Sequence, residues 1–449
     1  MQQKSKSEAK IVDDYEDFIS HKKDFFTFSS EFKPPDQIIW ELPCSKSHFI
    51  RWLFIAAQSE NDTVIKTPCR IGDDITSCAN VLEVLGVNIQ KNNDTWVVNG
   101  CKPGSYNLNP GILDCGNSAT TLRFISFLVA RNGINATIKG DESLSSRNFS
   151  ELIYILEKGG ISIKKEPSKF LPFTLSGIFN LSEIDVFTNK TSQLLSAILI
   201  TMPSSIEKNK LIFSEKIVSK PYFNLTLKLC KKTGAEVNYL GKILEIKTWI
   251  PQIINPVVIP GEASLIVFAL LFCKLHGCSV LVKNCPSDEE SLGFYKLKEY
   301  VSNLGLVWIQ GHGSIKLNIA EGESDNFTID ISENIDLITP LSLLLAISKG
   351  GTIKGITHAE NKESNRIKST IDLCEKFGFK SSYNSELIIY QSNISPPKNL
   401  IFANRDHRLQ MSAMILLTYS GGMADSFEWY ANSDPDFMKR LYCQGVSIN

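Results

Sequence analysis

Basic and hydroxyl side chains cluster where an apolar helix is predicted to begin. The stretch Pro43-Cys44-Ser45-Lys46-Ser47 runs into residues 49–57, whose apolar side chains fall on one helical face. Serine is a good helix cap, so Lys46 is expected at the helix start and Arg51 one turn inside. A helix N-terminus presents unpaired N–H groups and partial positive charge, which suits an anion. Taken alone, the pattern fits an ordinary capped core helix with solvated charges better.

The same pattern recurs at a nearly fixed spacing. Apolar helical runs with polar starts occur, in steps of 71 to 74 residues, near Ser47, Ser118, Ser192, Ser264, Asp336 and His407. A second signature, of helix end, glycine, alternating strand, turn and strand, follows the same period at Gly86, Gly160, Gly234, Gly305 and Gly378. A sixth copy begins at Gly445, and we expect the strand-like residues 36–42 to complete it from the other end of the chain.

A period of this length predicts duplicated α/β units rather than a thin solenoid, since each copy holds two helices and several strands. Six copies divide into two domains of three, with chain crossings near Leu42 and Gly261. We therefore expect one domain over residues 43–261 and another over residues 262–449. Residues 1–42 are expected to be an N-terminal extension plus a strand that joins the second domain. A ligand site between two such domains is the default expectation.

Composition favours a reduced, water-soluble protein. The 449 residues have a formal net charge of −1, which argues against a nucleic-acid coat or a membrane-surface protein. Eleven cysteines without a CxxC pair indicate thiols in a cytoplasmic protein. Residues 1–30 lack a signal-peptide core and are expected to form a poorly ordered extension. The longest apolar run, residues 263–273, is too short to cross a bilayer.

A metal site is a weaker alternative for one short stretch. Cys273, His276, Cys278 and Cys285 are close enough in sequence to suggest metal ligands. Cys273 ends a predicted apolar helix and Cys278 begins an apolar strand, where cysteine behaves as a small hydrophobe. We therefore expect no metal here.

Several predicted helix starts hold residues suited to bind phosphate or carboxylate. In the first domain these residues are Lys46, Ser47, Arg51, Thr120, Arg123, Arg147, Thr191, Ser192, Gln193, Ser219 and Tyr222, and in the second they are Lys362, Arg366 and Arg408, near the acids Asp336 and Glu363. Any one of them is usually a solvated cap. Their periodic placement favours a common site for ligands with several negative charges.

With these residues assembled, residues 38–445 resemble the enolpyruvyl transferase family, specifically its 5-enolpyruvylshikimate-3-phosphate synthases. The shared motifs are Ser-Lys-Ser with Arg51, Gly-Asn-Ser-Ala-Thr-Thr-Leu-Arg, Thr-Ser-Gln, Val-Ser-Lys-Pro-Tyr, Lys-Glu-Ser-Asn-Arg and Asp-His-Arg. The resemblance implies two inverse α/β domains, each of three βαβαββ-type units. It implies transfer of the enolpyruvyl group of phosphoenolpyruvate to the 5-hydroxyl of shikimate 3-phosphate with release of phosphate, a step of the shikimate pathway towards chorismate and the aromatic amino acids. No metal or organic cofactor, nucleic acid or membrane is implied, and we expect a monomer.

The resemblance also implies roles for individual residues. Shikimate 3-phosphate is assigned to Ser47, Arg51, Thr191, Ser192, Ser219, Tyr222 and Lys362, and both substrates to Lys46 and Gln193. Phosphoenolpyruvate is assigned to Arg147, Arg366 and Arg408, whose planar guanidinium groups can hold carboxylate and phosphate by paired hydrogen bonds. Asp336 is implied as the base at the attacking hydroxyl, with Glu363 and Lys46 as candidates for proton delivery. Closure of the domains is expected to exclude water.

Four positions depart from the family pattern. Ala119 stands where the phosphoenolpyruvate pocket usually has glycine, so we predict weaker inhibition by glyphosate than for a glycine enzyme. Asn432 aligns with a lysine that normally contacts phosphoenolpyruvate, and asparagine cannot supply that charge. Glu360 replaces a common arginine, and His358 a common asparagine. Arg405 is a hypothetical replacement for the missing charge.

These departures leave alternatives open: a slower synthase, a transferase acting on another anionic hydroxyl compound, or a homologue that binds without turnover. The branch acting on UDP-N-acetylglucosamine typically has Lys-Asn at the first motif and a loop cysteine, whereas this chain has Lys46-Ser47 and no obvious loop cysteine. A relative of RNA-terminal phosphate cyclase would need a basic face for nucleic acid, which the near-neutral charge disfavours.

Overall fold

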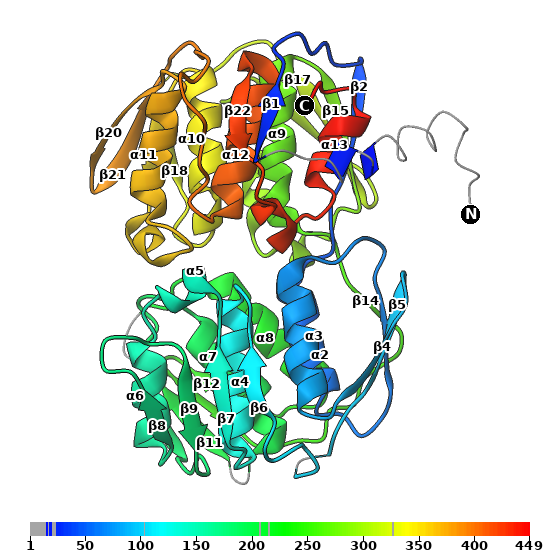
Figure 1. Ribbon diagram of the computed structural model, residues 1–449, viewed down its shortest axis with the longest axis vertical. Helices are drawn as coiled ribbons and strands as arrows, with labels where there is room; N and C mark the ends of the chain where they lie inside the picture. The colour runs from blue at the N-terminus through cyan, green and yellow to red at the C-terminus, as the bar shows by residue number, and fades with distance from the viewer. Residues whose placement is uncertain are drawn as a thin grey trace. The chain divides into compact units, whose positions relative to one another are not determined.

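The computed structural model describes residues 15, 16, 18, 19 and 24–449, except 103, 206, 207, 214, 215 and 326. The chain divides into two compact units (Figure 1). The middle unit is Cys44–Pro260, and the terminal unit combines Met1–Pro43 with Gly261–Asn449. The chain therefore passes from one unit to the other after Pro43 and again after Pro260.

Three repeats build the middle unit. The first comprises α2 (Lys46–Ala56), β3 (Thr63–Lys66), α3 (Asp73–Val84), β4 (Asn88–Lys91) and β5 (Thr95–Asn99), with β14 (Val257–Val258) added from the end of the unit. The second comprises β6 (Gly111–Asp114), α4 (Ala119–Arg131), β7 (Ala136–Lys139), α5 (Glu142–Ser145), α6 (Ser150–Lys158), β8 (Ser162–Lys165) and β9 (Phe173–Ser176). The third comprises β10 (Glu183–Asp185), α7 (Gln193–Ile200), η1 (Met202–Ser204), β11 (Asn209–Ile212), α8 (Lys220–Lys232), β12 (Val237–Leu240) and β13 (Ile243–Ile246).

The terminal unit repeats this plan with one change. Its first repeat comprises β2 (Gln37–Glu41), η2 (Ala263–Leu265), α9 (Ile266–His276), β15 (Ser279–Lys283), η3 (Glu289–Ser291), η4 (Phe294–Glu299), β16 (Leu306–Gln310) and β17 (Ser314–Ile319), so short 3-10 turns replace the second helix. The next comprises β18 (Thr328–Asp330), η5 (Ile335–Leu337), α10 (Ile338–Ile347), β19 (Gly351–Lys354), η6 (Thr357–Asn361), α11 (Arg366–Lys376), β20 (Lys380–Asn384) and β21 (Glu386–Tyr390). The last comprises α12 (His407–Ser420), β22 (Gly422–Asp425), η7 (Trp429–Asn432), α13 (Phe437–Cys443) and β1 (Phe25–Phe28).

Five four-stranded sheets share one strand order. In each, an edge strand runs parallel to a central strand, and a hairpin completes the sheet: β14-β3-β5-β4, β6-β7-β9-β8, β10-β11-β13-β12, β2-β15-β17-β16 and β18-β19-β21-β20. The five hairpins begin just after the glycines that the sequence singles out. Those glycines all have positive φ, which a side chain would disfavour, and they end the preceding helix or turn as predicted.

The sixth sheet overturns one sequence-based prediction. Residues 36–42 do not complete the sixth repeat, because β2 pairs in parallel with β15 of the fourth. Strand β1 takes that place: Phe25–Phe28 pairs antiparallel with β22, and Phe28 bridges Ile448. Phe26 and Phe28 are buried. The expectation of a poorly ordered extension is therefore wrong for residues 25–28, where alternate phenylalanines give the strand an apolar face.

One helix from each repeat forms the core of its unit. In the middle unit α2, α4 and α7 pack on one another, and in the terminal unit α9, α10 and α12 do so. Helices α9 and α10 are buried on nearly all sides, as expected for apolar helices inside a core. These six helices begin at the recurring polar motif, so the fold gathers three motif copies within each unit. Within the described parts of the chain, no helix is long and apolar enough to cross a membrane.

Candidate active site

In the terminal unit, Arg408 joins the starts of three core helices. Its Nη2 donates to Ser264 Oγ at 2.8 Å, just before α9, and its Nη1 donates to the carbonyl of Asp336 at 3.3 Å, just before α10. Arg408 itself is the second residue of α12. The recurring motifs of this unit therefore meet at one place.

Arg366, the first residue of α11, is surrounded by three carboxylates. The side chain is fully buried, and its nitrogens donate to Asp406 at 2.8 Å, to Asp336 at 2.5 Å and to Glu363 at 2.5 Å. Burial alone would lower the pKa of Arg366, but the charges of Asp406, Glu363 and Asp336 raise it instead. The guanidinium is thus permanently charged and fixes the positions of all three acids.

Asp336 lies among cations. Lys362 Nζ is 3.4 Å and Arg408 Nε is 3.9 Å from its Oδ1. Burial would raise the pKa of Asp336, but Lys362, Arg408 and Arg366 outweigh burial and hold it well below its usual range. Asp336 is therefore ionised at neutral pH, the form that can accept a proton. We call Ser264, Asp336, Lys362, Glu363, Arg366, Asp406 and Arg408 the terminal cluster.

In the middle unit, Arg51 ties α2 to α8. It is 2% exposed, and it donates from Nε to Thr226 Oγ1 at 2.8 Å and from Nη2 to the carbonyl of Tyr222 at 3.2 Å. Its Nη1 donates to the carbonyl of Ser47 at 2.9 Å. Burial lowers the pKa of Arg51 to about 10, so it remains charged at neutral pH. Its partners are neutral oxygens, and Arg51 orders two predicted ligand-binding segments.

A second arginine, which is partly buried, joins α4 to α7. Arg123 Nη1 donates to Gln193 Oε1 at 2.6 Å and to the carbonyl of Ala119 at 3.2 Å. Because its oxygen is held, the Gln193 amide presents N–H groups elsewhere. Thr191 Oγ1 accepts from the Gln193 N–H at 3.1 Å. Burial, then the charge of Arg147, lowers the pKa of Arg123 to about 10.

Ser192 and Ser219 link the starts of α7 and α8. Ser192 Oγ donates to the carbonyl of Ser219 at 3.1 Å. Ser219 has φ of 54°, a left-handed conformation that a non-glycine residue rarely adopts. Such strain is common at ligand-binding positions. The hydrogen bond places both predicted shikimate 3-phosphate residues side by side.

Lys46 and Arg147 each have a polar partner in this unit. Lys46 Nζ lies 2.8 Å from Asp74 Oδ2, at the first turn of α3. Arg147 Nη2 donates to Asn117 Oδ1 at 2.6 Å, and Asn117 Nδ2 donates to Asp141 Oδ2 at 2.8 Å. We call the following residues the middle cluster: Lys46, Ser47, Arg51, Asp74, Asn117, Ala119, Arg123, Asp141, Arg147, Thr191, Ser192, Gln193, Ser219 and Tyr222.

Several residues of both clusters were not predicted as site residues. Asp406 caps α12 and also accepts a hydrogen bond from Arg366, although 40 positions separate the two residues in the chain. Asn117 holds Arg147 across 30 positions. The only sequence signal for Asp406 is its place as an acidic residue at a helix start. The only signal for Asn117 is that it belongs to the second motif, Gly-Asn-Ser-Ala-Thr-Thr-Leu-Arg. Ser264 and Asp74 likewise have local roles as a helix start and a first-turn acid.

Three of the four departing residues, His358, Glu360 and Asn432, belong to the terminal unit. Glu360 is exposed. Burial, then the charge of Lys362, lowers the pKa of His358 to about 4, so its imidazole is neutral. The Arg405 guanidinium lies 5.9 Å from the ring centroid of Trp429. Trp429 belongs to the short helix η7, which also contains Asn432. That Arg405 replaces the missing lysine charge stays a prediction.

Among the residues that the structure describes, no three or more His, Cys, Asp or Glu side chains form a group that could hold a metal. Cys273, Cys278 and Cys285 are buried. Burial raises the pKa of these thiols to about 12, 11 and 12, respectively, which keeps them protonated.

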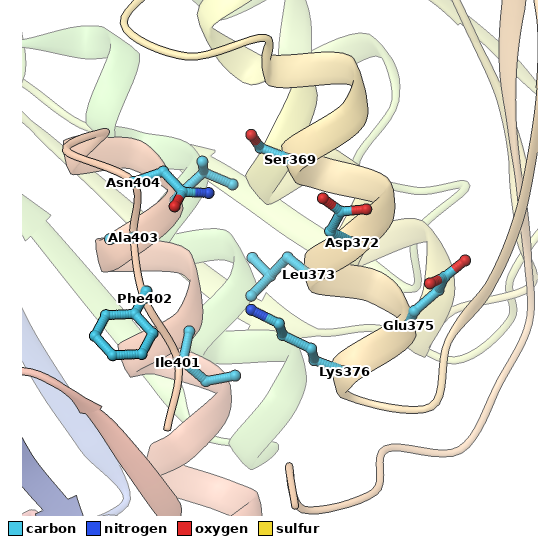
Figure 2. A pocket seen from close by; sticks show the side chains of 10 residues that line it. Ser369, Asp372, Leu373, Glu375, Lys376, Ile401, Phe402, Ala403 and Asn404 are labelled. Atoms are coloured by element: carbon cyan, nitrogen blue, oxygen red, sulfur yellow. The ribbon is translucent and has the colours of Figure 1, made fainter. Parts of the chain in front are cut away.

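A separate cavity of about 430 Å³ opens beside α11 (Figure 2). It is lined by Asp372, Glu375 and Lys376 of this helix and by Phe402 and Asn404 of another segment. None of the predicted site residues lines this cavity. The charged clusters, rather than the shape of this cavity, therefore define the candidate active site.

Comparison with solved structures identifies the class of fold. EPSP synthase from Acinetobacter baumannii matches with a TM-score of 0.74 and 19% identity, over 95% of this chain and 99% of that one. The enolpyruvyl transferase NikO from Streptomyces tendae matches with a TM-score of 0.72 and 12% identity, over 95% of this chain and 98% of the other. The chain therefore has the enolpyruvyl transferase fold, as predicted.

Sequence comparison narrows this class to a family. The family model for EPSP synthase (3-phosphoshikimate 1-carboxyvinyltransferase) matches residues 36–441, and the chain belongs to this family. A 3-phosphoshikimate 1-carboxyvinyltransferase from Sulfurisphaera tokodaii is 29% identical over 420 residues, which cover 91% of this chain and 95% of the relative. One from Methanococcoides burtonii is 26% identical over 417 residues, 90% of this chain and 95% of the relative.

Proposed function

We propose that this protein transfers the enolpyruvyl group of phosphoenolpyruvate to the 5-hydroxyl of shikimate 3-phosphate and releases phosphate. Membership of the EPSP synthase family supports this reaction. The observation that supports it most directly is the terminal cluster, in which Arg366 fixes two acids, Asp336 and Glu363, beside the cations Lys362 and Arg408. In this role the protein would act in the shikimate pathway, towards chorismate and the aromatic amino acids.

The middle cluster is proposed to hold most of shikimate 3-phosphate. Hydroxyl and amide groups of Ser47, Thr191, Ser192, Gln193 and Ser219 would bind the phosphate and ring oxygens at helix starts, where N–H groups add partial positive charge. Arg51 is nearly inaccessible, so we propose that it acts through Ser47 and Tyr222, whose carbonyls it holds. Lys362 would add a contact from the terminal cluster.

Arg147 and Arg408 are proposed to bind phosphoenolpyruvate. Arg147 is partly exposed and is held in place by the neutral Asn117 side chain, so its charge remains available to an anion. Arg408 is held by Ser264 oxygens and by the carbonyl of Asp336. Arg366 already donates to three carboxylates, so we propose that its main effect is to position Asp336 and Glu363.

Asp336, Glu363 and Lys46 are the residues proposed to transfer protons. The 5-hydroxyl oxygen of shikimate 3-phosphate would attack C2 of phosphoenolpyruvate while Asp336 accepts the hydroxyl proton. Glu363 or Lys46 would protonate the methylene carbon of phosphoenolpyruvate. Its lowered pKa keeps Asp336 ionised but makes it a weak base. Anionic substrates bound at Lys362 and Arg408 would offset those charges and raise the pKa of Asp336 towards its ordinary value.

A second candidate is enolpyruvyl transfer to another anionic hydroxyl compound. Two observations support this second candidate. The identities to two named relatives are only 26% and 29%, and Asn432 stands where the family has a lysine. The test is a phosphate-release assay with phosphoenolpyruvate, run with shikimate 3-phosphate, with shikimate or without acceptor. The proposed function predicts release only with shikimate 3-phosphate and a product that contains an enolpyruvyl ether. Release with a different acceptor alone identifies the second candidate, and substrate binding without release identifies a non-catalytic homologue.

A further inference from the structure

Two cysteines outside the proposed chemistry lie in contact in the middle unit. Cys44 Sγ and Cys69 Sγ are 2.8 Å apart, although 25 positions separate the residues in the chain. The Cys44 thiol also approaches the carbonyl of Cys69 at 3.8 Å. Both are thiols rather than halves of a disulfide. Since an S–S bond is about 2.05 Å long, bond formation requires the sulfurs to approach by less than about 1 Å.

The pair combines a shielded sulfur with a reachable one. Cys44 is 2% exposed, whereas Cys69 is half-buried. A small oxidant can therefore reach Cys69, and Cys44 is placed to resolve the oxidised product. Deeply buried thiols elsewhere are less reactive, because burial raises the pKa of Cys230 and of Cys374 to about 12.

The two cysteines belong to segments that also meet at Lys46. Cys44 is the first residue of the middle unit and lies two positions before Lys46. Cys69 lies in the connection between β3 and α3, and the first turn of α3 contains Asp74, which pairs with Lys46 at 2.8 Å. A bond between the sulfurs would fasten the same two segments that this ion pair joins.

We propose that Cys44 and Cys69 are a redox-modification site whose reversible disulfide lowers the activity that depends on Lys46. The oxidant is a peroxide. The Cys69 thiolate attacks one peroxide oxygen and breaks the O–O bond, which gives a sulfenic acid and, after protonation, water. Cys44 then attacks the sulfenic sulfur, so the S–S bond forms as the S–O bond breaks and a second water leaves. Two thiols and one hydrogen peroxide yield one disulfide and two waters.

Mass spectrometry of the full-length protein tests the modification itself. The protein is treated with hydrogen peroxide, alkylated with N-ethylmaleimide and digested. We expect a disulfide-linked pair of peptides that contain Cys44 and Cys69. Dithiothreitol should reduce the disulfide and separate the two peptides. The Cys69→Ser variant should lose this peptide, and the matched control Cys101→Ser, which changes another partly exposed cysteine, should retain it. Alkylation of both Cys44 and Cys69 after oxidation, or their pairing with other cysteines, would overturn the site.

The effect on activity rests on the proposed function and is measured separately. A displacement of up to about 1 Å at a substrate-positioning group can slow a reaction up to about 100-fold. We expect oxidation to lower kcat at least about fivefold, dithiothreitol to restore it, and Cys69→Ser to be insensitive to peroxide. A linked peptide with an unchanged rate would overturn the effect on activity. An unoxidised protein without transferase activity would disprove the proposed function and leave the peptide result standing.

Discussion

The two clusters balance their charges in opposite ways. In the terminal cluster, Lys362, Arg366 and Arg408 lie among three carboxylates, and Arg366 alone contacts all three. In the middle cluster, Arg51, Arg123 and Arg147 donate to carbonyl, hydroxyl and amide oxygens. The partly exposed Arg147, with neutral partners, keeps its charge for an anionic ligand, whereas Arg366 positions the acids with which it pairs. We infer that the middle cluster mainly binds and the terminal cluster mainly moves protons.

The largest expected effect comes from removing the proposed base. Asp336→Asn keeps the shape of the side chain but removes its charge, so kcat should fall about 1,000-fold, within the range for loss of a general base. Steady-state phosphate release measures it. The exposed Asp325→Asn in the same unit is the control and should leave kcat unchanged. A fall of less than about tenfold would remove Asp336 as the base.

Replacing Arg366 tests the charge balance of the terminal cluster through stability. Arg366→Met leaves buried carboxylates without their cation, so the free energy of unfolding should fall by about 3–5 kcal/mol at pH 7. Arg147→Met replaces a partly exposed side chain whose partners are neutral, so it should cost less than about 1 kcal/mol. Urea denaturation of both variants makes the comparison. Equal losses would contradict the contrast between the clusters.

The pH dependence of this stability has a definite sign. The folded-state pKa of Asp336 is lowered, so its stabilising contribution is present above the ordinary aspartate pKa of about 3.9 and is lost as pH falls through the folded value. The deficit of Arg366→Met should therefore shrink at acid pH, as Asp336 becomes protonated. Repeating the urea series from pH 7 down to about pH 2.5, below the ordinary aspartate pKa, measures this. A deficit that grows as the pH falls below about 4 would contradict the proposed pairing.

A smaller effect is expected at the middle cluster. Arg147→Gln removes the charge but retains hydrogen bonding, and loss of a charge-assisted bond to a substrate should raise the KM for phosphoenolpyruvate about 10- to 100-fold. The change in kcat should be smaller than the change in KM. Lys102→Gln, on the exposed surface of the same unit, is the control. A variant that lost only kcat would assign Arg147 to chemistry rather than binding.

The smallest expected effect concerns Ala119. Removing its methyl group in Ala119→Gly should lower the inhibition constant of glyphosate by up to about tenfold, as expected for one methyl group at a pocket wall. The KM for phosphoenolpyruvate should change less. Inhibition assays at fixed phosphoenolpyruvate measure the difference, and an inhibition constant that did not fall would place Ala119 outside the pocket.

Local and periodic features could be predicted from the sequence, whereas long-range pairings could not. Ser118 was recognisable as a helix start, and its side chain accepts the backbone N–H of Thr121 as a cap. The role of strand β1 was missed because buried and exposed side chains alternate both in Phe25–Phe28 and in β2. The local sequence does not determine which of the two strands pairs with β22. Asp406 was not predicted as a site residue because its role depends on Arg366, which only the fold brings within 2.8 Å.

Calorimetric titration of shikimate 3-phosphate into Asp336→Asn tests the division of roles most directly. If the middle cluster provides most of the binding and Asp336 moves the proton, this variant should bind shikimate 3-phosphate within about tenfold of the unaltered protein's affinity, a difference of up to about 1.4 kcal/mol, while turnover is almost lost. A loss of affinity as large as the loss of turnover would show that binding is not separable from the terminal cluster and would contradict the account.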